Sequence, residues 1–191
     1  MDLILVRHGL PERSRVSSDP PLSESGREQA ARVAVYLGRE TIDAVWASTM
    51  KRAIETAAPF ASAANLELRT HHGICEYDRS GGEYVPDEVL KVENFEAWKG
   101  LMSGAHGYDL EAFQADVVAG MEHIIAENPG GRVAVFCHGG VINVWTAHVL
   151  GMPARLFFAP TYASVNRFAC ARSGVRSVLS LNEQDHLREL A

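Results

Sequence analysis

Leu3-Ile4-Leu5-Val6-Arg7-His8-Gly9 is the stretch of sequence that decides the fold. Its first four residues are an uninterrupted apolar run, which is typical of a strand covered on both faces. A basic residue, an imidazole and a glycine follow where such a strand would end. In open α/β sheets ligands bind beyond the carboxyl ends of the strands. The residues that follow each apolar run are therefore the candidates for a site.

Outward from this stretch, strand-like runs alternate with segments of helical spacing. Further strands are predicted at 42–46, 66–70 and 133–137. Helices are predicted at 23–37, 50–63, 109–128 and 141–150, with Pro59 kinking or ending the second. The end of the chain, 164–171 and 175–181, is typical of a hairpin. The pattern predicts an α/β fold, a three-layer αβα sandwich whose mixed sheet is mainly parallel, with a C-terminal antiparallel hairpin.

One segment, about 79–107, breaks this rhythm. It is rich in glycine and includes one helical pattern, in which Val89, Val92, Phe95 and Trp98 recur. The segment follows Glu76 closely, so we expect it to lie over the mouth of a pocket as a lid insertion. We expect residues 1–191 to form a single domain around it.

Composition narrows the class of protein. The chain has 191 residues, 47% of them hydrophobic, and a net charge of −6, as in a globular protein and unlike a basic nucleic-acid binder. The first apolar run is too short for a membrane span or an export signal. The three cysteines, Cys75, Cys137 and Cys170, are widely spaced and predict reduced thiols. We expect a cytoplasmic protein.

The residues after the predicted strands suggest a phosphoryl-binding pocket. Arg7 and His8 follow the first strand, Arg52 the second, Glu76 the third and His138 the fourth. Guanidinium groups match phosphate oxygens, and the glycines after each histidine, Gly9 and Gly139, let backbone approach a ligand. An imidazole beside a phosphoryl group is a candidate nucleophile, and a carboxylic acid can protonate the leaving oxygen.

Each residue alone has a simpler interpretation. A strand-end histidine more often satisfies a structural hydrogen bond, and Glu76 or Arg52 alone would be a surface residue. His71, His72 and Glu76 can be drawn as metal ligands, but their spacing lacks the helical arrangement of known zinc motifs. We expect no metal and no cofactor. The combination at successive strand ends carries the prediction.

The set of motifs resembles the histidine phosphatase superfamily, which includes the cofactor-dependent phosphoglycerate mutases. The matching motifs, in order, are Arg7-His8-Gly9, Pro21-Leu22-Ser23-x-x-Gly26-x-x-Gln29-Ala30, Ser48-x-x-x-Arg52-Ala53-x-x-Thr56-Ala57, Glu76 and His138-Gly139-Gly140. The resemblance covers nearly the whole chain. It implies a phosphoglycerate mutase-like fold.

The resemblance also implies catalytic roles. His8 would form a phosphohistidine, while Arg7, Arg52 and His138 would line the phosphate pocket. Glu76 would act first as the general acid and then as the base that activates water.

Two departures from the mutase pattern favour a phosphatase. Leu10-Pro11-Glu12-Arg13-Ser14 stands where a mutase is expected to carry an asparagine, so we expect Arg13 and Ser14 to contact substrate instead. Tyr77-Asp78-Arg79-Ser80-Gly81 replaces the mutase run Arg-His-Tyr-Gly. We expect hydrolysis of a small-molecule phosphomonoester. A phosphoglycerate mutase and a phospholigand-binding module without turnover are the alternatives. We expect neither nucleic acid nor membrane as a partner, and leave a homodimer open.

Overall fold

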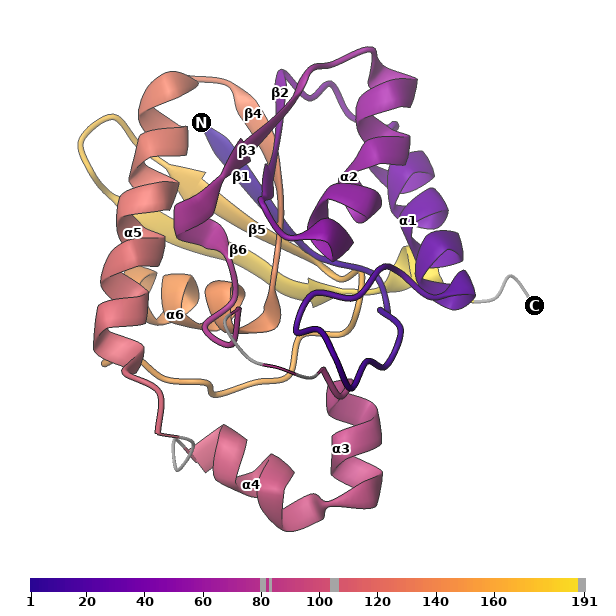
Figure 1. Cartoon of the computed structure of the whole chain (residues 1–191). Coiled ribbons are helices and arrows are strands. Elements are labelled where there is room, and N and C mark those ends of the chain that lie inside the picture. The colour runs from indigo at the N-terminus through magenta and orange to yellow at the C-terminus, as the bar shows by residue number, and fades with distance from the viewer. Residues whose placement is uncertain (80–81, 83, 104–106, 189–191) are drawn as a thin grey trace.

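The protein is described from a computed structural model, which covers residues 1–79, 82, 84–103 and 107–188. Its centre is a six-stranded sheet with the order β3-β2-β4-β1-β5-β6 (Figure 1). The first four strands in this order are parallel, β5 is antiparallel to β1, and β6 is antiparallel to β5. The strands are β1 (Asp2–Arg7), β2 (Ala44–Ser48), β3 (Leu68–His71), β4 (Arg132–Cys137), β5 (Val165–Cys170) and β6 (Arg176–Glu183).

Helices cover both faces of the sheet, as the sequence predicts. Figure 1 shows α1 and α2 on one face and α5 and α6 on the other. The helices of the sandwich are α1 (Glu24–Leu37), α2 (Lys51–Ala64), α5 (Leu110–Glu127) and α6 (Gly139–Val149). Two short 3-10 helices, His72–Ile74 and Asp185–Leu187, follow β3 and β6.

The alternation of side chains along each strand explains the two cores. Leu3 and Leu5 of β1 pack in the cluster that includes α5 and α6, whereas Ile4 and Val6 pack in the cluster that includes α1 and α2. All four are buried, and each contributes about 1.5–3 kcal/mol relative to an exposed position. The predicted three-layer sandwich, with its C-terminal hairpin, is confirmed.

One helix boundary differs from its prediction, and one of the two alternatives for Pro59, that it ends its helix, is excluded. Pro59 lies inside α2 without ending it, since that helix continues to Ala64. The helix after β4 begins at Gly139, with His138 as its N-cap residue, two residues earlier than predicted. Both glycines of the His-Gly-Gly motif therefore belong to the first helical turn, where backbone N–H groups have no partner within the helix.

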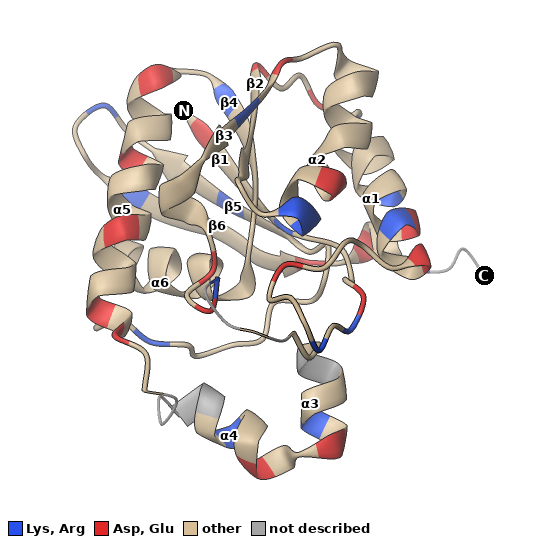
Figure 2. Cartoon of the chain, viewed as in Figure 1, with Lys and Arg blue, Asp and Glu red and all other residues tan. Residues whose placement is uncertain are grey.

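The described part of the segment 79–107 contains two helices rather than one, α3 (Asp87–Glu93) and α4 (Phe95–Ser103). Asn94 separates them because its backbone leaves the helical region, with φ −149° and ψ 78°. Its side-chain Oδ1 then accepts the N–H of Ala97. In Figure 1 both helices stand apart from the sandwich, beyond the loops at the carboxyl ends of the parallel strands. Figure 2 shows charges of both signs on them.

A dense set of contacts fixes the loop that follows β1. The N–H of Gly9 donates to Thr56 Oγ1 at 2.9 Å, and the N–H of Leu10 donates to Gln29 Oε1 at 2.8 Å. The Leu10 carbonyl accepts from Ser23. Gly26 lies so close to this loop that a Cβ on it would sit 2.1 Å from the Leu10 carbonyl oxygen. Residues of the Pro-Leu-Ser and Ser-x-x-x-Arg motifs therefore hold the backbone that carries His8.

Replacing Gly26 by alanine tests this packing. We expect Gly26→Ala to destabilise the fold by about 1–3 kcal/mol, because backbone must move to admit the methyl group. Urea unfolding followed by circular dichroism measures the effect. Gly100→Ala is the control, since an added Cβ there would meet no described atom within 4 Å beyond its own stretch of helix. Equal stabilities of the two variants would contradict the close approach.

Candidate active site

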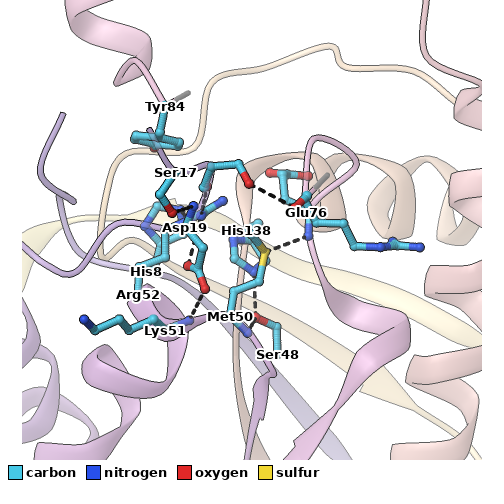
Figure 3. Close-up of polar contacts among 12 residues, drawn as sticks. His8, Ser17, Asp19, Ser48, Met50, Lys51, Arg52, Glu76, Tyr84 and His138 are labelled. Atoms are coloured by element: carbon cyan, nitrogen blue, oxygen red, sulfur yellow. Dashed lines mark hydrogen bonds and ion pairs between the residues drawn. The ribbon is translucent and has the colours of Figure 1, made fainter. Parts of the chain in front are cut away.

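Five ionisable side chains meet at the carboxyl ends of the parallel strands, and Figure 3 shows four of them, His8, Arg52, Glu76 and His138. β1 ends in Arg7 and is followed by His8, while β4 is followed by His138. Arg52 comes from the first turn of α2, and Glu76 follows the 3-10 helix after β3. Each of the five is at most 8% exposed. Burial of this many ionisable groups is costly and is typical of a functional site.

His8 has a defined tautomer. Its Nδ1 lies 2.8 Å from the carbonyl oxygen of Gly9, which can only accept, so Nδ1 carries the proton. Its Nε2 accepts from Arg52 Nε at 3.2 Å. Burial lowers the pKa of His8 well below its usual value, and the charges of Arg52, His138 and Arg7 lower it further. The imidazole is therefore neutral at pH 7, with a lone pair on Nε2.

His138 lies beside His8, with 5.1 Å between the ring centroids. Its Nε2 is 2.7 Å from Ser48 Oγ, which itself accepts the N–H of Met50. With the Ser48 hydroxyl donating to Nε2, the ring proton of His138 lies on Nδ1. That Nδ1 is buried and has no hydrogen-bond partner among the described residues. An orphaned buried donor is rare in proteins and suits an incoming acceptor.

The two arginines are held in place by neighbouring groups. Arg52 donates from Nη1 to the Ser18 carbonyl at 2.8 Å and to Asp19 Oδ1 at 3.3 Å. Its Nη2 is 3.8 Å from Asp78 Oδ1. Arg7 donates to the Pro160 carbonyl and lies 3.8 Å from the centroid of the Tyr162 ring. These contacts pre-organise both guanidinium groups before any ligand binds.

Glu76 is a carboxyl group whose pKa fits an acid–base role. Burial raises its pKa to about 7, and the charge of Asp78 raises it too, against opposing contributions from the backbone and Arg52. Its Oε2 accepts the N–H of Gly140 at 2.9 Å and its Oε1 that of Tyr77 at 3.2 Å. A Cβ on Gly140 would lie 2.2 Å from Oε1. The second glycine of the His-Gly-Gly motif therefore leaves room for this carboxyl.

The structure places most, but not all, of the predicted residues together. Arg7, His8, Arg52, Glu76 and Gly139 line one pocket, and His138 lies next to His8. Gly9 supports the site through its carbonyl and its N–H and is not part of the pocket lining. Arg13 pairs with Glu93 of α3 at 2.8 Å, and Ser14 Oγ accepts from the amides of Val16 and Ser17. Neither lies among the residues that line the pocket.

Sequence reasoning missed several residues of this pocket. Asn143 of α6 donates to the Gly139 and Phe158 carbonyls and accepts from the amides of Phe157 and Phe158. It thereby holds one wall of the pocket against the helix. A polar residue within the apolar stretch from Val141 to Trp145 was the available signal. Tyr162, which packs on Arg7 beside the pocket and has its hydroxyl oxygen 3.1 Å from that of Tyr84, had no such signal.

The described residues contain neither a membrane-spanning helix nor a metal-binding cluster. None of the described helices has the length and apolar character that crossing a membrane requires. Among the described side chains, no three His, Cys, Asp or Glu residues gather in a way that could hold a metal ion. His71 Nδ1 accepts the N–H of Gly73, and its ring packs 5.0 Å from that of His123, rather than turning toward Glu76.

Comparisons with known proteins agree with this geometry. The family model of the histidine phosphatase superfamily (branch 1) matches residues 3–184. A probable phosphatase of Schizosaccharomyces pombe is 31% identical over 161 residues, covering 78% of this chain and 74% of that protein. Phosphoserine phosphatase 1 of Hydrogenobacter thermophilus is 38% identical over 104 residues, so the aligned part spans only about half of either chain, 50% and 49%.

A solved structure shows the same fold. The phosphoserine complex of a phosphoserine phosphatase variant from Entamoeba histolytica superimposes with a TM-score of 0.78 at 21% identity, covering 98% of this chain and 99% of that one. With the family match over nearly the whole length, the chain belongs to the histidine phosphatase superfamily. The family and the names of these relatives support the predicted phosphoric monoester hydrolase activity.

Ser48 offers a test of how His138 is held. We expect Ser48→Ala to lower kcat for p-nitrophenyl phosphate by about tenfold, because loss of one hydrogen bond, worth about 0.5–1.5 kcal/mol, frees the ring proton to move to Nε2. Steady-state kinetics and a melting curve measure the effect. Thr49→Ala removes the adjacent hydroxyl, which does not contact His138, and should leave kcat unchanged. A similar loss in both variants would point to a general disturbance of the loop.

Proposed function

We propose that this protein hydrolyses a small-molecule phosphomonoester through a phosphohistidine at His8. The observation that carries the proposal is the state of His8, which is buried and neutral, with Nδ1–H held by the Gly9 carbonyl and Nε2 facing Arg52. A neutral imidazole with a fixed lone pair is a nucleophile, and the adjacent cations suit a phosphoryl group.

In the first step, the Nε2 lone pair of His8 attacks phosphorus and the bond from phosphorus to the ester oxygen breaks. The three equatorial oxygens gain negative charge, which is stabilised by Arg7, Arg52 and the Nδ1–H of His138. Such pre-organised donors supply most of the catalysis in phosphoryl transfer. The leaving oxygen takes a proton from Glu76, whose pKa of about 7 keeps a useful fraction protonated near neutral pH.

In the second step, the carboxylate of Glu76 accepts a proton from water, and that water attacks the phosphohistidine. The N–P bond breaks, the electron pair returns to Nε2, and inorganic phosphate leaves. Glu76 ends the cycle protonated again. The same group thus serves as acid and then as base, which needs a pKa near the working pH.

The two alternative functions, a phosphoglycerate mutase and a binding module, predict different experimental results. A phosphoglycerate mutase of this family would need a bisphosphate to prime its histidine, whereas the proposed phosphatase needs none. A binding module would retain phosphate without turnover. The phosphatase names of the relatives favour hydrolysis. The buried Glu76 carboxyl, which phosphate binding alone would not require, favours an enzyme over a binding module.

Several finer predictions belong to this proposal. They are a single domain over 1–191, a lid role for 79–107, substrate contacts from Arg13 and Ser14 and a cytoplasmic location, while a homodimer stays open. Trp98 of α4 lines the pocket, which supports the lid role. Glu83, a further residue that we expect to contact substrate, lies outside the described residues.

Removing His8 tests the nucleophile. We expect His8→Ala to lose all measurable turnover of p-nitrophenyl phosphate, because no other histidine is among the described residues that line the pocket. Rapid alkaline quenching of the wild type with radiolabelled substrate should trap an acid-labile phosphoprotein. His123→Ala, which changes a histidine that packs on Trp46 and His71, is the control and should keep its activity. Residual activity of His8→Ala well above background would rule out the mechanism.

Replacing Glu76 tests the proton donor. We expect Glu76→Gln to lower kcat/KM for an alkyl phosphate by about 10²–10⁴-fold, and for p-nitrophenyl phosphate far less, since nitrophenolate leaves without a proton. In the wild type, the raised pKa means that Glu76 is protonated below about pH 7 and loses its proton above it. Alkyl-ester cleavage should therefore fall as pH rises through 7. Equal losses on both esters would indicate a binding role instead.

A further inference from the structure

The backbone of His8 is held from both sides at the point where the chain leaves β1. On one side its N–H donates to the Cys137 carbonyl at 2.9 Å, and on the other its carbonyl accepts the N–H of Ala163 at 3.1 Å. The N–H of the preceding residue, Arg7, donates to the Ser164 carbonyl at 3.1 Å. The chain just before β5 therefore fixes the main chain of the proposed nucleophile as directly as the central strand β4 does.

This turn, residues 160–164, also holds the side chain of Arg7. The Pro160 carbonyl accepts from Arg7 Nη1, and the guanidinium carbon lies 3.8 Å from the centroid of the Tyr162 ring. The same tyrosine ring lies 5.5 Å from the imidazole of His8, measured between centroids. A shift of the turn would therefore move the nucleophile and one phosphate-binding arginine together.

The turn has a backbone conformation that residues other than glycine rarely adopt. Ala163 has a φ of 59°, in the left-handed region, although it carries a Cβ. A residue keeps such a backbone only where the contacts around it impose that conformation. Ala163 is also fully buried, so its carbonyl needs a hydrogen-bond partner inside the protein. The groups that bind the far side of this turn therefore contribute to keeping His8 in place.

Two side chains near the end of the chain make these contacts. His186, in the 3-10 helix after β6, places its Nε2 2.9 Å from the Ala163 carbonyl, and Asn182 Oδ1 accepts the N–H of Thr161 at 2.7 Å. Because a carbonyl can only accept, Nε2 of His186 carries the ring proton. Its Nδ1 has no hydrogen-bond partner among the described residues. The ring also stacks on Tyr36 of α1, with 4.7 Å between the centroids.

We propose that His186 and Asn182 are positioning residues for the phosphoryl transfer. Neither is among the described residues that line the pocket, and both act through the turn, whose Ala163 holds the main chain of His8. This inference rests on the function proposed above and adds to it residues that do not touch the phosphoryl group. Such support matters because a displacement of about 1 Å, caused far from the reacting atoms, can cost about 10²-fold in rate.

Two substitutions at His186 separate its hydrogen bond from its packing. His186→Phe keeps a ring that can stack on Tyr36 and removes the donor, whereas His186→Gln removes the ring and keeps an amide N–H for the Ala163 carbonyl. We expect kcat for p-nitrophenyl phosphate to fall about 10- to 100-fold in His186→Phe and no more than about threefold in His186→Gln. Arg32→Ala is the control, since it removes a different contact to the same 3-10 helix, at the Leu187 carbonyl, and should keep the wild-type kcat.

Hydrogen exchange of the Ala163 amide measures the hold on the turn without any turnover. This amide donates to the His8 carbonyl, so it should exchange faster than in the wild type in folded His186→Phe and at nearly the wild-type rate in His186→Gln. An active Phe variant beside an inactive Gln variant would show that the ring only packs, and would overturn the proposal. An equal fall of kcat in Arg32→Ala would overturn it too, because any disturbance of the 3-10 helix would then suffice.

A substitution at Asn182 provides a second test, which decides the matter if His186→Phe does not fold. Asn182 has a φ of 56°, so glycine adopts its backbone readily, and Asn182→Gly removes the side-chain acceptor for the N–H of Thr161. We expect kcat to fall about tenfold or more, and a wild-type kcat in this variant would overturn the proposal. If the wild type hydrolysed no ester, the proposed function would fall and the catalytic role of both residues with it. Unchanged exchange of the Ala163 amide in His186→Phe would instead overturn this inference alone.

Discussion

The parallel pairing of β1 with β4 is the constraint on which the rest of the site depends. In this register Arg7 lies opposite Cys137, so the residues that follow, His8 and His138, leave the sheet side by side. The N–H of His8 also donates to the Cys137 carbonyl, which continues the pairing one residue beyond the strand. Two central strands buried on both faces hold this register firmly, because a slip of one residue would move every apolar side chain to the opposite face.

Burial then sets the protonation states of the side chains in the site. The cluster is taken out of water, so each charge acts through a lower dielectric and shifts its neighbours strongly. Burial lowers the pKa of both imidazoles and the arginines lower it further, while burial raises the pKa of Glu76, because a buried charge is costly in each case. A nucleophile that is unprotonated and an acid that is protonated thus coexist near pH 7. A phosphoryl dianion is the ligand that best compensates two buried guanidinium groups.

Much of the fold and of the site could be predicted from the sequence, because the signals that mark them are local. Apolar runs followed at once by polar residues locate the strand ends, and strand ends locate the site. Contacts between distant segments could not be predicted in this way. The partner of Arg13 is Glu93, eighty residues away, and the role of Ser48 depends on which ring nitrogen of His138 it meets. The division of the 79–107 segment at Asn94 depends on one backbone conformation within an otherwise continuous helical pattern.

The protonation state of His8 is the central claim, and nitrogen NMR of the histidine side chains measures it most directly. With ¹⁵N-labelled protein, assigned by comparison with His8→Gln, the account predicts a single neutral tautomer of His8, with the proton on Nδ1, from about pH 6 to pH 8, since its pKa lies well below 6.5. A His8 ring that gains a second proton near pH 6.5, or that carries its proton on Nε2, would contradict the account.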